Sequence, residues 1–326
     1  MRILVVGAGA VGGYFGGRLL EAGRDVTFLV RPRRAAELAR IGLVIRSQHG
    51  DVEIPAPPTV TAETLRGPID LILVSCKAYD LNGAADSFAP AVGSKTAILP
   101  LLNGMRHLDD LDARFGAGHV LGGQCVISSV LDEAGRIIHL NEAHSLSFGE
   151  RDGSRPARVE AIASDMSGAR FESRLSQAIL QEMWEKWVFI ATGAGITCLM
   201  RATVGDIVAA GAADFVTALL DECAAIAAAQ GYPPGPSLMQ RSRAIFTKPR
   251  SELTASMFRD IERRAPIEAD HIIGDLLRRG HLAGAAGEQA NSSPLLRIVY
   301  AHLKAYEARR EREVSRGAAV DGGSAQ

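Results

Sequence analysis

The feature that most constrains the fold is a glycine pattern in RILVVGAGAVGGYFGGRLL, residues 2–20. Three glycines have G-x-G-x-x-G spacing directly after a short apolar run and at the start of a segment with helical spacing. The first glycine of such a pattern permits a tight turn, the second lets the backbone approach a pyrophosphate, and the third lets the helix pack on the strand. The helix N-terminus then offers free N–H groups to phosphate oxygens. We therefore predict a dinucleotide-binding turn formed by Gly7, Ala8, Gly9, Ala10, Val11 and Gly12.

The first half of the chain alternates between short apolar runs and helical segments. Continuous apolar runs bounded by turns are typical of parallel strands that are covered on both faces. A more broken strand-rich stretch follows, up to residue 150. The pattern predicts a Rossmann-type, doubly wound α/β domain over residues 1–173. Its strands are expected at 2–6, 26–30, 70–76 and 96–102, with helices at 11–22 and 33–40.

The second half is helical almost to its end. The alanine-rich segment 213–232 closes with glycine and is followed by two prolines, as a helix C-terminus should be. Segment 264–280 has a proline near its start, which places Glu268 in the first turn of a predicted helix. We expect an all-α domain over 174–308. Residues 309–326 lose apolar content and are predicted to be a disordered tail.

Composition narrows the possible partners and compartments. A chain of 326 residues favours two domains, and its net charge of −1 gives no indication of nucleic-acid or membrane-surface binding. The four cysteines form no Cys-x-x-Cys pair, which argues against a zinc site and suits a reducing cytosol. The best membrane candidate, 187–200, is too short and too rich in glycine to span a bilayer. We expect a cytoplasmic protein without a metal, and the helical domain could support a homodimer.

The strand predicted at 26–30 ends in basic residues, Arg31, Arg33 and Arg34. NAD sites commonly carry an acidic residue here for the ribose 2′-hydroxyl, whereas NADP sites use arginine for the 2′-phosphate. A guanidinium group can contact phosphate oxygens in a bidentate manner. The sequence therefore predicts NADPH/NADP+ as cofactor, with Arg31 as the main contact. The alternative is a solvated basic turn that starts the next helix.

One lysine stands out in QEMWEKWVFIAT, residues 181–192. A cofactor domain followed by a helical domain is typical of a dehydrogenase whose active site lies between the two. Lys186, between Trp184 and Trp187, could protonate the oxygen of a carbonyl as hydride arrives at its carbon. The alternative is a surface lysine whose aliphatic stem covers the tryptophans.

Several separated motifs together resemble the ketopantoate reductase (2-dehydropantoate 2-reductase) family, nearly from end to end. They are ILVVGAGAVGG, LILVSCKAYD, LLNGM, WEKWV and the C-terminal SMFRDIERRAPIEADHIIGDLLRRG. Their order along the chain makes the resemblance far more specific than the glycine pattern alone. It implies NADPH-dependent reduction of a small 2-oxo acid to a 2-hydroxy acid, in pantothenate synthesis by the family name.

The resemblance also implies roles for single residues. Lys186 would be the proton donor to the substrate carbonyl, and Ser256 would approach the substrate carboxylate. Asn103 would lie where cofactor and substrate meet. The remaining cofactor contacts would be Arg31 and Lys77 at the phosphates, together with Ser128 and Glu268.

The chain departs from this family where the substrate would bind. Asparagines of its pantoate-forming members are replaced here by Ile190, Ala194, Val204 and Leu253. One interpretation is a reductase of a different, less hydroxylated 2-oxo acid or related carbonyl. Another is ketopantoate reductase itself, with Thr192 or Thr197 supplying the missing hydrogen bonds. A remote third is a non-catalytic NADP(H)-binding sensor, against which Lys186 and Glu268 both argue.

Overall fold

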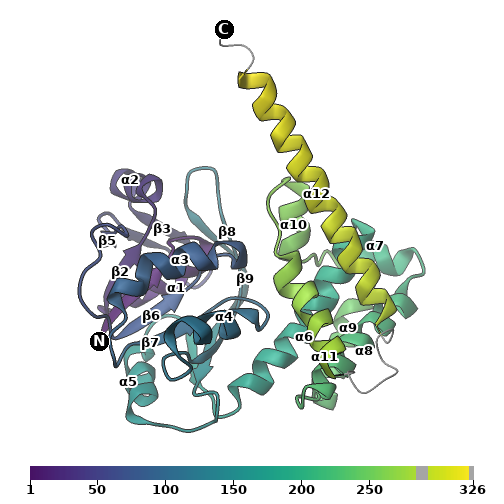
Figure 1. The fold of residues 1–326 in the computed structure, drawn as a ribbon, viewed down its shortest axis with the longest axis horizontal. Coiled ribbons are helices and arrows are strands. Elements are labelled where there is room, and N and C mark those ends of the chain that lie inside the picture. Colours follow the sequence, from purple (N-terminus) through teal and green to yellow (C-terminus); the bar gives the residue numbers. More distant parts are fainter. Residues whose placement is uncertain (284–292, 323–326) are drawn as a thin grey trace. The chain divides into compact units, whose positions relative to one another are not determined.

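The computed structural model describes residues 1–283 and 293–322 (Figure 1). The chain forms two compact units, Met1–Met183 and Trp184–Gln326. The division between them lies within helix α6 (Ile179–Met200), whereas the sequence analysis places the domain boundary at residue 173. Within the described residues, no helix combines the length and the hydropathy that a membrane span requires.

The first unit contains a five-stranded sheet in the order β5-β2-β1-β6-β7, and all its pairings are parallel. The strands β6 and β7 are buried along their whole length, which explains why their sequences are continuously apolar. The predicted doubly wound parallel sheet is confirmed. Its strands are β1 (Arg2–Val6), β2 (Asp25–Leu29), β5 (Thr59–Val60), β6 (Leu71–Val74) and β7 (Ala97–Pro100).

A second sheet in the same unit has the order β10-β9-β3-β4, and β8 pairs with β9 as a long antiparallel hairpin. The strand-rich stretch predicted up to residue 150 is this hairpin, whereas the sequence analysis did not identify the short strands β3 and β4. The strands are β3 (Leu43–Arg46), β4 (Val52–Ile54), β8 (Gly122–Leu131), β9 (Ile137–Gly149) and β10 (Glu172–Leu175).

Helix α1 (Ala10–Glu21) packs closely against both sheets through its glycines. A Cβ atom at Gly16 would lie 2.6 Å from the ring of Phe28 in β2. On the other side, a Cβ at Gly17 would lie 2.7 Å from Ile45 in β3. The absence of side chains at these positions therefore lets α1 sit between two hydrophobic surfaces. The other helical segments of the unit are α2 (Pro32–Ile41), η1 (Ala78–Asp80), α3 (Leu81–Phe88), η2 (Ala89–Ala91), α4 (Arg106–Phe115) and α5 (Ala157–Met166).

The described residues of the second unit form helices and no strands, as the sequence predicts. Trp184 and Trp187 are buried in its core with ring centroids 4.9 Å apart, and the guanidinium of Arg279 lies over both rings. The segments after α6 are α7 (Val204–Ala209), α8 (Ala213–Ala229), α9 (Pro236–Phe246), α10 (Ser256–Glu262), the π-helical turn η3 (Asp270–Gly274), α11 (Asp275–Ala283) and α12 (Pro294–Gly322).

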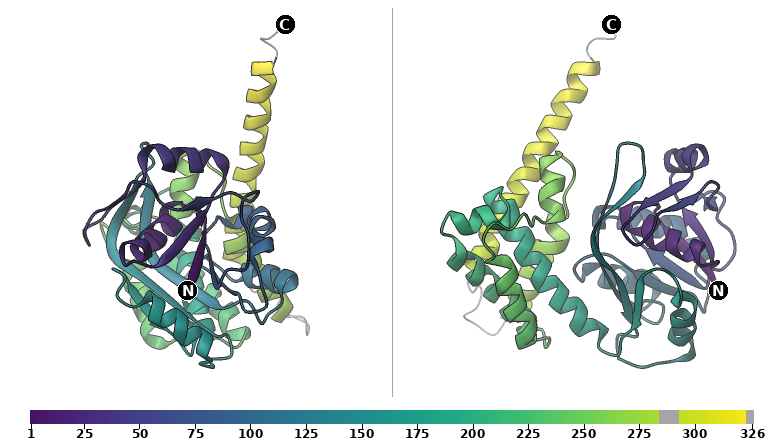
Figure 2. Two further views of the ribbon diagram at one scale, coloured as in Figure 1. Left: turned by 90° about the vertical axis from the view of Figure 1, so that its left-hand side faces the viewer. Right: turned by 180° about the vertical axis from the view of Figure 1, so that it is seen from behind.

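Two expectations for this unit need correction. The predicted disordered tail is helical over 309–322, and the end of α12 extends beyond the other helices of its unit (Figure 2). Arg309 pairs with Glu313 one turn later, so a polar sequence is supported as a helix by its own charges. Residues 323–326 lie outside the described residues. Glu268 precedes the helix instead of lying in its first turn, because its carbonyl accepts the opening hydrogen bond, from the Ile272 amide at 3.0 Å.

Candidate functional site

The glycine turn lies at the carboxyl end of β1, the central strand. The chain adds β2 and β5 on one side of β1, and β6 and β7 on the other. This switch point is where open α/β sheets bind ligands. Gly7 has a φ of 95°, which a residue with a side chain adopts only under strain. The hydroxyl of Ser75 donates to the Val6 carbonyl at 2.8 Å, and a Cβ at Gly12 would overlap that hydroxyl oxygen. Gly7 and Gly12 are thus required by the fold itself.

Gly9 is different, because an ideal Cβ at this position has no heavy atom within 4 Å. The backbone there faces open space, directly before the first residue of α1. No side chain caps this helix, so its first N–H groups are left for a ligand or solvent. The arrangement fits a pyrophosphate, which needs both a close backbone approach and N–H donors.

The arginines at the basic end of β2 have different partners. Arg34 donates to the Ala8 carbonyl at 3.1 Å and pairs with Glu37 at 2.6 Å, so it fastens α2 to the glycine turn. The Arg31 side chain is 77% exposed, and its Nη2 lies 2.6 Å from Asp80 Oδ1. The hydrogen bond and charge of Asp80 raise the pKa of Arg31. Sequence reasoning identified Arg31 but not its acidic neighbour.

Two other predicted cofactor residues follow neighbouring strands of the same sheet. Lys77 comes after β6 and is half-buried, and its carbonyl accepts the Asp80 amide at 2.9 Å to start η1. Asn103 comes after β7 and is also half-buried, next to Gly104 with a φ of 80°. Since all these strands are parallel, the carboxyl edge of the sheet brings Lys77 and Asn103 to the same side as Gly9 and Arg31.

Ser128 lies within a strand, at an irregularity in the β8–β9 hairpin. Pairing passes from Ile127 opposite His144 to Ser129 opposite His139, so β9 carries extra residues between its two paired segments. The Ser128 amide donates to Asn141 Oδ1 in this bulge at 2.9 Å. Bulges of this kind re-aim side chains, and they are frequent next to active sites.

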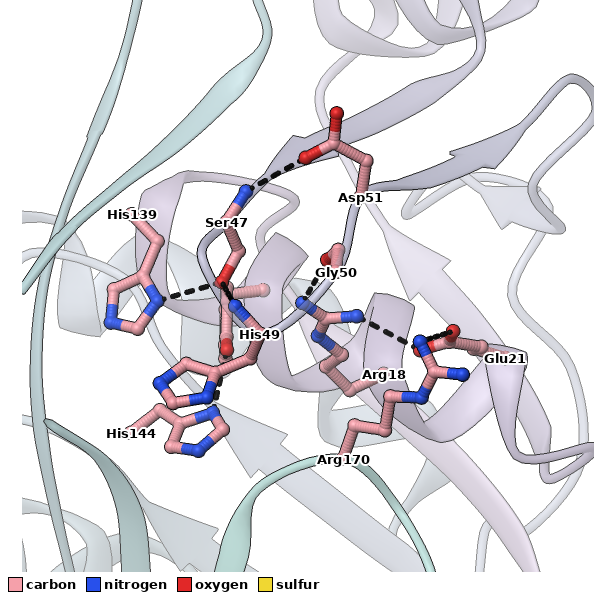
Figure 3. A network of polar contacts seen from close by, with 10 residues as sticks. Arg18, Glu21, Ser47, His49, Gly50, Asp51, His139, His144 and Arg170 are labelled. Carbon is pink, nitrogen blue, oxygen red and sulfur yellow. Dashed lines mark hydrogen bonds and ion pairs between the residues drawn. The ribbon is translucent and has the colours of Figure 1, made fainter. Parts of the chain in front are cut away.

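A cluster of three histidines holds the bulge in place (Figure 3). His49 Nε2 donates a hydrogen bond to the Glu142 carbonyl at 2.8 Å, and His139 Nε2 donates one to the Ala143 carbonyl at 3.1 Å. His144 Nδ1 lies 2.7 Å from the Tyr14 hydroxyl on α1. Burial, followed by the charges of His49 and His139, lowers the pKa of His144. The sequence does not indicate this cluster, because His49 lies far along the chain from His139 and His144, which both belong to β9.

The histidines have hydrogen-bond partners of their own and are not arranged as metal ligands. Among residues 1–283 and 293–322, no group of three or more His, Cys, Asp or Glu side chains could hold a metal ion. The four cysteines form no disulfide, and three of them, Cys125, Cys198 and Cys223, are buried.

In the second unit, Lys186 is half-buried on α6 between two fully buried tryptophans. The indole Nε1 of Trp187 donates to the Ile272 carbonyl at 2.8 Å, and the Ile272 amide donates to the Glu268 carbonyl. These two bonds tie the turn of α6 that carries Lys186 to the segment that starts at Glu268. Arg279 already covers the rings of both tryptophans, so covering them does not require the aliphatic stem of Lys186.

Ser256 lies near a different part of α6. It is exposed at the first position of α10, and the preceding Ala255 amide lies 3.3 Å from Thr197 Oγ1. Thr197 is about three helical turns beyond Lys186, so Ser256 is anchored to a different part of the helix. The structure therefore connects Glu268, but not Ser256, to the turn that carries Lys186.

The positions that lack the family's asparagines have no replacement donor in α6. Ala194 is buried and Ile190 half-buried. Thr192 donates its hydroxyl to the Val188 carbonyl at 2.8 Å, and Thr197 donates to the Gly193 carbonyl at 2.7 Å. A hydroxyl has a single hydrogen to donate, so both threonines use theirs within the helix.

Comparisons with known proteins cover nearly the whole chain. Residues 3–153 match the family model of ketopantoate reductase PanE/ApbA, and residues 178–307 match the model of its C-terminal domain. A Bacillus subtilis protein described as uncharacterized oxidoreductase YkpB is 39% identical, over 94% of this chain and 99% of its own length.

Solved structures show the same fold. The 2-dehydropantoate 2-reductase of Geobacter metallireducens aligns with a TM-score of 0.83 and 29% identity, over 93% of this chain and 99% of that one. A D-mandelate dehydrogenase in a ternary structure with NADH and anilino(oxo)acetate aligns with a TM-score of 0.83 at 21% identity, over 95% and 100% of the two chains.

Proposed function

This chain belongs to the ketopantoate reductase family, and from that premise we propose that it uses NADPH to reduce a 2-oxo acid to a 2-hydroxy acid. The observation that carries the proposal is the open backbone at Gly9, before an uncapped helix and beside the exposed Arg31. These groups offer what a dinucleotide phosphate needs, namely N–H donors, a positive charge and no obstructing side chain.

When bound, the nicotinamide cofactor would supply the hydride that the keto carbon of the substrate accepts. In our proposal, the N–H groups at the start of α1 hold the pyrophosphate, and Arg31 and Lys77 contact cofactor phosphates. Lys186 presents its ammonium group to the keto oxygen and donates a proton as negative charge develops there. Its half-buried position strengthens this interaction, because charges attract more strongly where water is partly excluded.

Other residues would orient the two ligands. We assign Asn103 to the region where cofactor and substrate meet, and Ser128 and Glu268 to cofactor contacts. Ser256 is assigned to the substrate carboxylate. The hydrogen bonds through Trp187 and Ile272 support a joint role for Lys186 and Glu268, since they fix the backbone of both.

A specific observation favours a second candidate, reduction of a 2-oxo acid other than ketopantoate. Ketopantoate carries a hydroxyl that needs a polar partner on burial, and a missing partner costs about 1–3 kcal/mol. Ile190 and Ala194 offer none, and the hydroxyl hydrogens of Thr192 and Thr197 are used within α6. A substrate with an apolar group in place of that hydroxyl would be favoured by roughly one to two orders of magnitude.

The test is oxidation of NADPH by the purified protein, followed by absorbance with ketopantoate and with a panel of other 2-oxo acids. Efficient turnover of ketopantoate would support the family's named reaction. Weak turnover of ketopantoate with faster turnover of an apolar 2-oxo acid would support the second candidate. Binding of NADPH without turnover of any 2-oxo acid would contradict both.

A further inference from the structure

The exposed arginine at the ribose end of the proposed cofactor site has an acidic partner. Arg31 follows β2 and Asp80 ends η1, which follows β6. Because β1 lies between β2 and β6, the ion pair crosses the sheet edge beyond the carboxyl end of β1. The pair therefore lies at the same switch point as the glycine turn.

Asp80 changes what the basic strand end can recognise. A 2′-phosphate placed on Arg31 would carry about two negative charges at neutral pH, as phosphate monoesters do, and would lie beside a carboxylate. Part of the guanidinium fork is also already in use, since Nη2 donates to Asp80 Oδ1 at 2.6 Å. A ribose 2′-hydroxyl meets neither obstacle, because it is neutral and can donate a hydrogen bond to a carboxylate.

We infer that Asp80 is a specificity-determining residue that weakens the preference for NADPH created by Arg31 and lets the protein bind NADH as well. Asp80 acts in two ways: it repels the 2′-phosphate, and it accepts a hydrogen bond from the 2′-hydroxyl of NADH. The inference rests on the proposed function, since it requires a dinucleotide at the glycine turn.

The experiment measures dissociation constants of NADPH and NADH by nucleotide fluorescence for the native protein and three variants. Asp80→Asn removes the negative charge but keeps a side chain that can hydrogen-bond Arg31. Arg31→Ala removes the cation. Asp86→Asn is the matched control, because Asp86 is an exposed aspartate paired with Arg114 at 2.6 Å on the neighbouring helix.

We expect Asp80→Asn to raise the ratio of NADPH to NADH affinity by roughly five- to fiftyfold, and more at low ionic strength. Arg31→Ala should abolish the advantage of NADPH, and Asp86→Asn should leave the ratio unchanged. An unchanged or lowered ratio in Asp80→Asn would overturn the inference and show that Asp80 only orients Arg31. If the native protein binds neither nucleotide, the proposed function fails together with the inference; if it binds both, only the variants decide.

Discussion

The imidazole rings of His49 and His144 stack with their centroids 3.7 Å apart and their planes 13° from parallel. Such a pair is unfavourable when both rings are charged, and His139 lies within 6 Å of each. Burial, followed by the charges of His49 and His139, lowers the pKa of His144, so this ring favours its neutral form. Nearby Arg18, which lies over the Tyr14 ring, adds a further positive charge.

The first prediction concerns the pH dependence of stability. Because the pKa of His144 is lowered in the folded state, the unfolded chain binds the proton more tightly. The stability contributed by neutral His144 is fully present above about pH 6.5 and is lost as the pH falls from there through the lower folded-state pKa. Urea denaturation of the native protein between pH 8 and 5 should show this loss.

His144→Asn should flatten the same pH profile, because asparagine does not titrate and can still hydrogen-bond the Tyr14 hydroxyl. His281→Asn, at an exposed position on α11, serves as the control and should keep the native slope. An equally steep profile in His144→Asn would show that other groups cause the acid sensitivity.

The second prediction distinguishes the glycine that the fold requires from the glycine that ligand binding requires. Gly9→Ala places a methyl group in open space, so its stability should be nearly native while NADPH affinity falls at least tenfold. Gly12→Ala forces a methyl group onto Ser75 and should destabilise the protein by about 1–3 kcal/mol. Thermal denaturation and nucleotide titration of the two variants check this. Native NADPH affinity in Gly9→Ala would contradict the proposed pyrophosphate position.

The third prediction tests the proton donor. Lys186→Ala should lower kcat by about 10²–10⁴-fold while leaving the dissociation constant of NADPH within a few-fold of native. Lys248→Ala, at an exposed lysine, should behave as the native protein in both measurements. Steady-state kinetics with the preferred 2-oxo acid is the assay. A native kcat in Lys186→Ala would remove this residue from the mechanism.

The fourth prediction concerns the thiols. Burial raises the pKa of Cys198 and of Cys223 to about 12, so neither forms an appreciable thiolate at pH 8. Both should stay unmodified by iodoacetamide in the folded protein and become modified in guanidinium chloride, as followed by peptide mass spectrometry. Rapid labelling of either cysteine in the folded state would indicate local opening of its helix.

The fifth prediction addresses substrate choice. Ile190→Asn restores an amide at a position where the resemblance expects one, and this position is only half-buried. It should raise kcat/KM for ketopantoate about tenfold relative to an apolar 2-oxo acid of similar size. Equal changes for both substrates would mean that residue 190 does not contact the group by which they differ.

The features that the sequence predicts well depend on local pattern. The strand at 2–6 and the turn at Gly7 are specified by consecutive residues, and continuous apolar runs are sufficient to identify a buried parallel sheet. The pairing of Arg31 with Asp80 depends instead on strand order, since the two residues are brought together only when β6 is placed beside β1. The histidine cluster escapes prediction for the same reason.

Two local predictions needed correction, one for the C-terminal tail and one for the helix start near residue 266. Charged residues at the end of the chain lack the apolar content of a core helix, yet ion pairs such as Arg309–Glu313 support α12 there. Pro266 suggested an early helix start, but Ile267 is buried and the helical hydrogen bonds begin only at the Glu268 carbonyl. The helix therefore starts two residues beyond Pro266, after the buried Ile267.

Helix α1 contains the glycine pairs 12–13 and 16–17. Each glycine makes an isolated helix less stable by about 1 kcal/mol relative to alanine. Such a segment has little tendency to form before its surroundings exist, and those surroundings are both sheets of the unit. The smallest autonomously folding fragment of this unit must accordingly contain strands β3 and β9 as well as the parallel sheet. A shortened fragment that ends after β7 would lose not only β9 but also the ordered glycine turn at residues 7–12, although every residue of that turn would still be present.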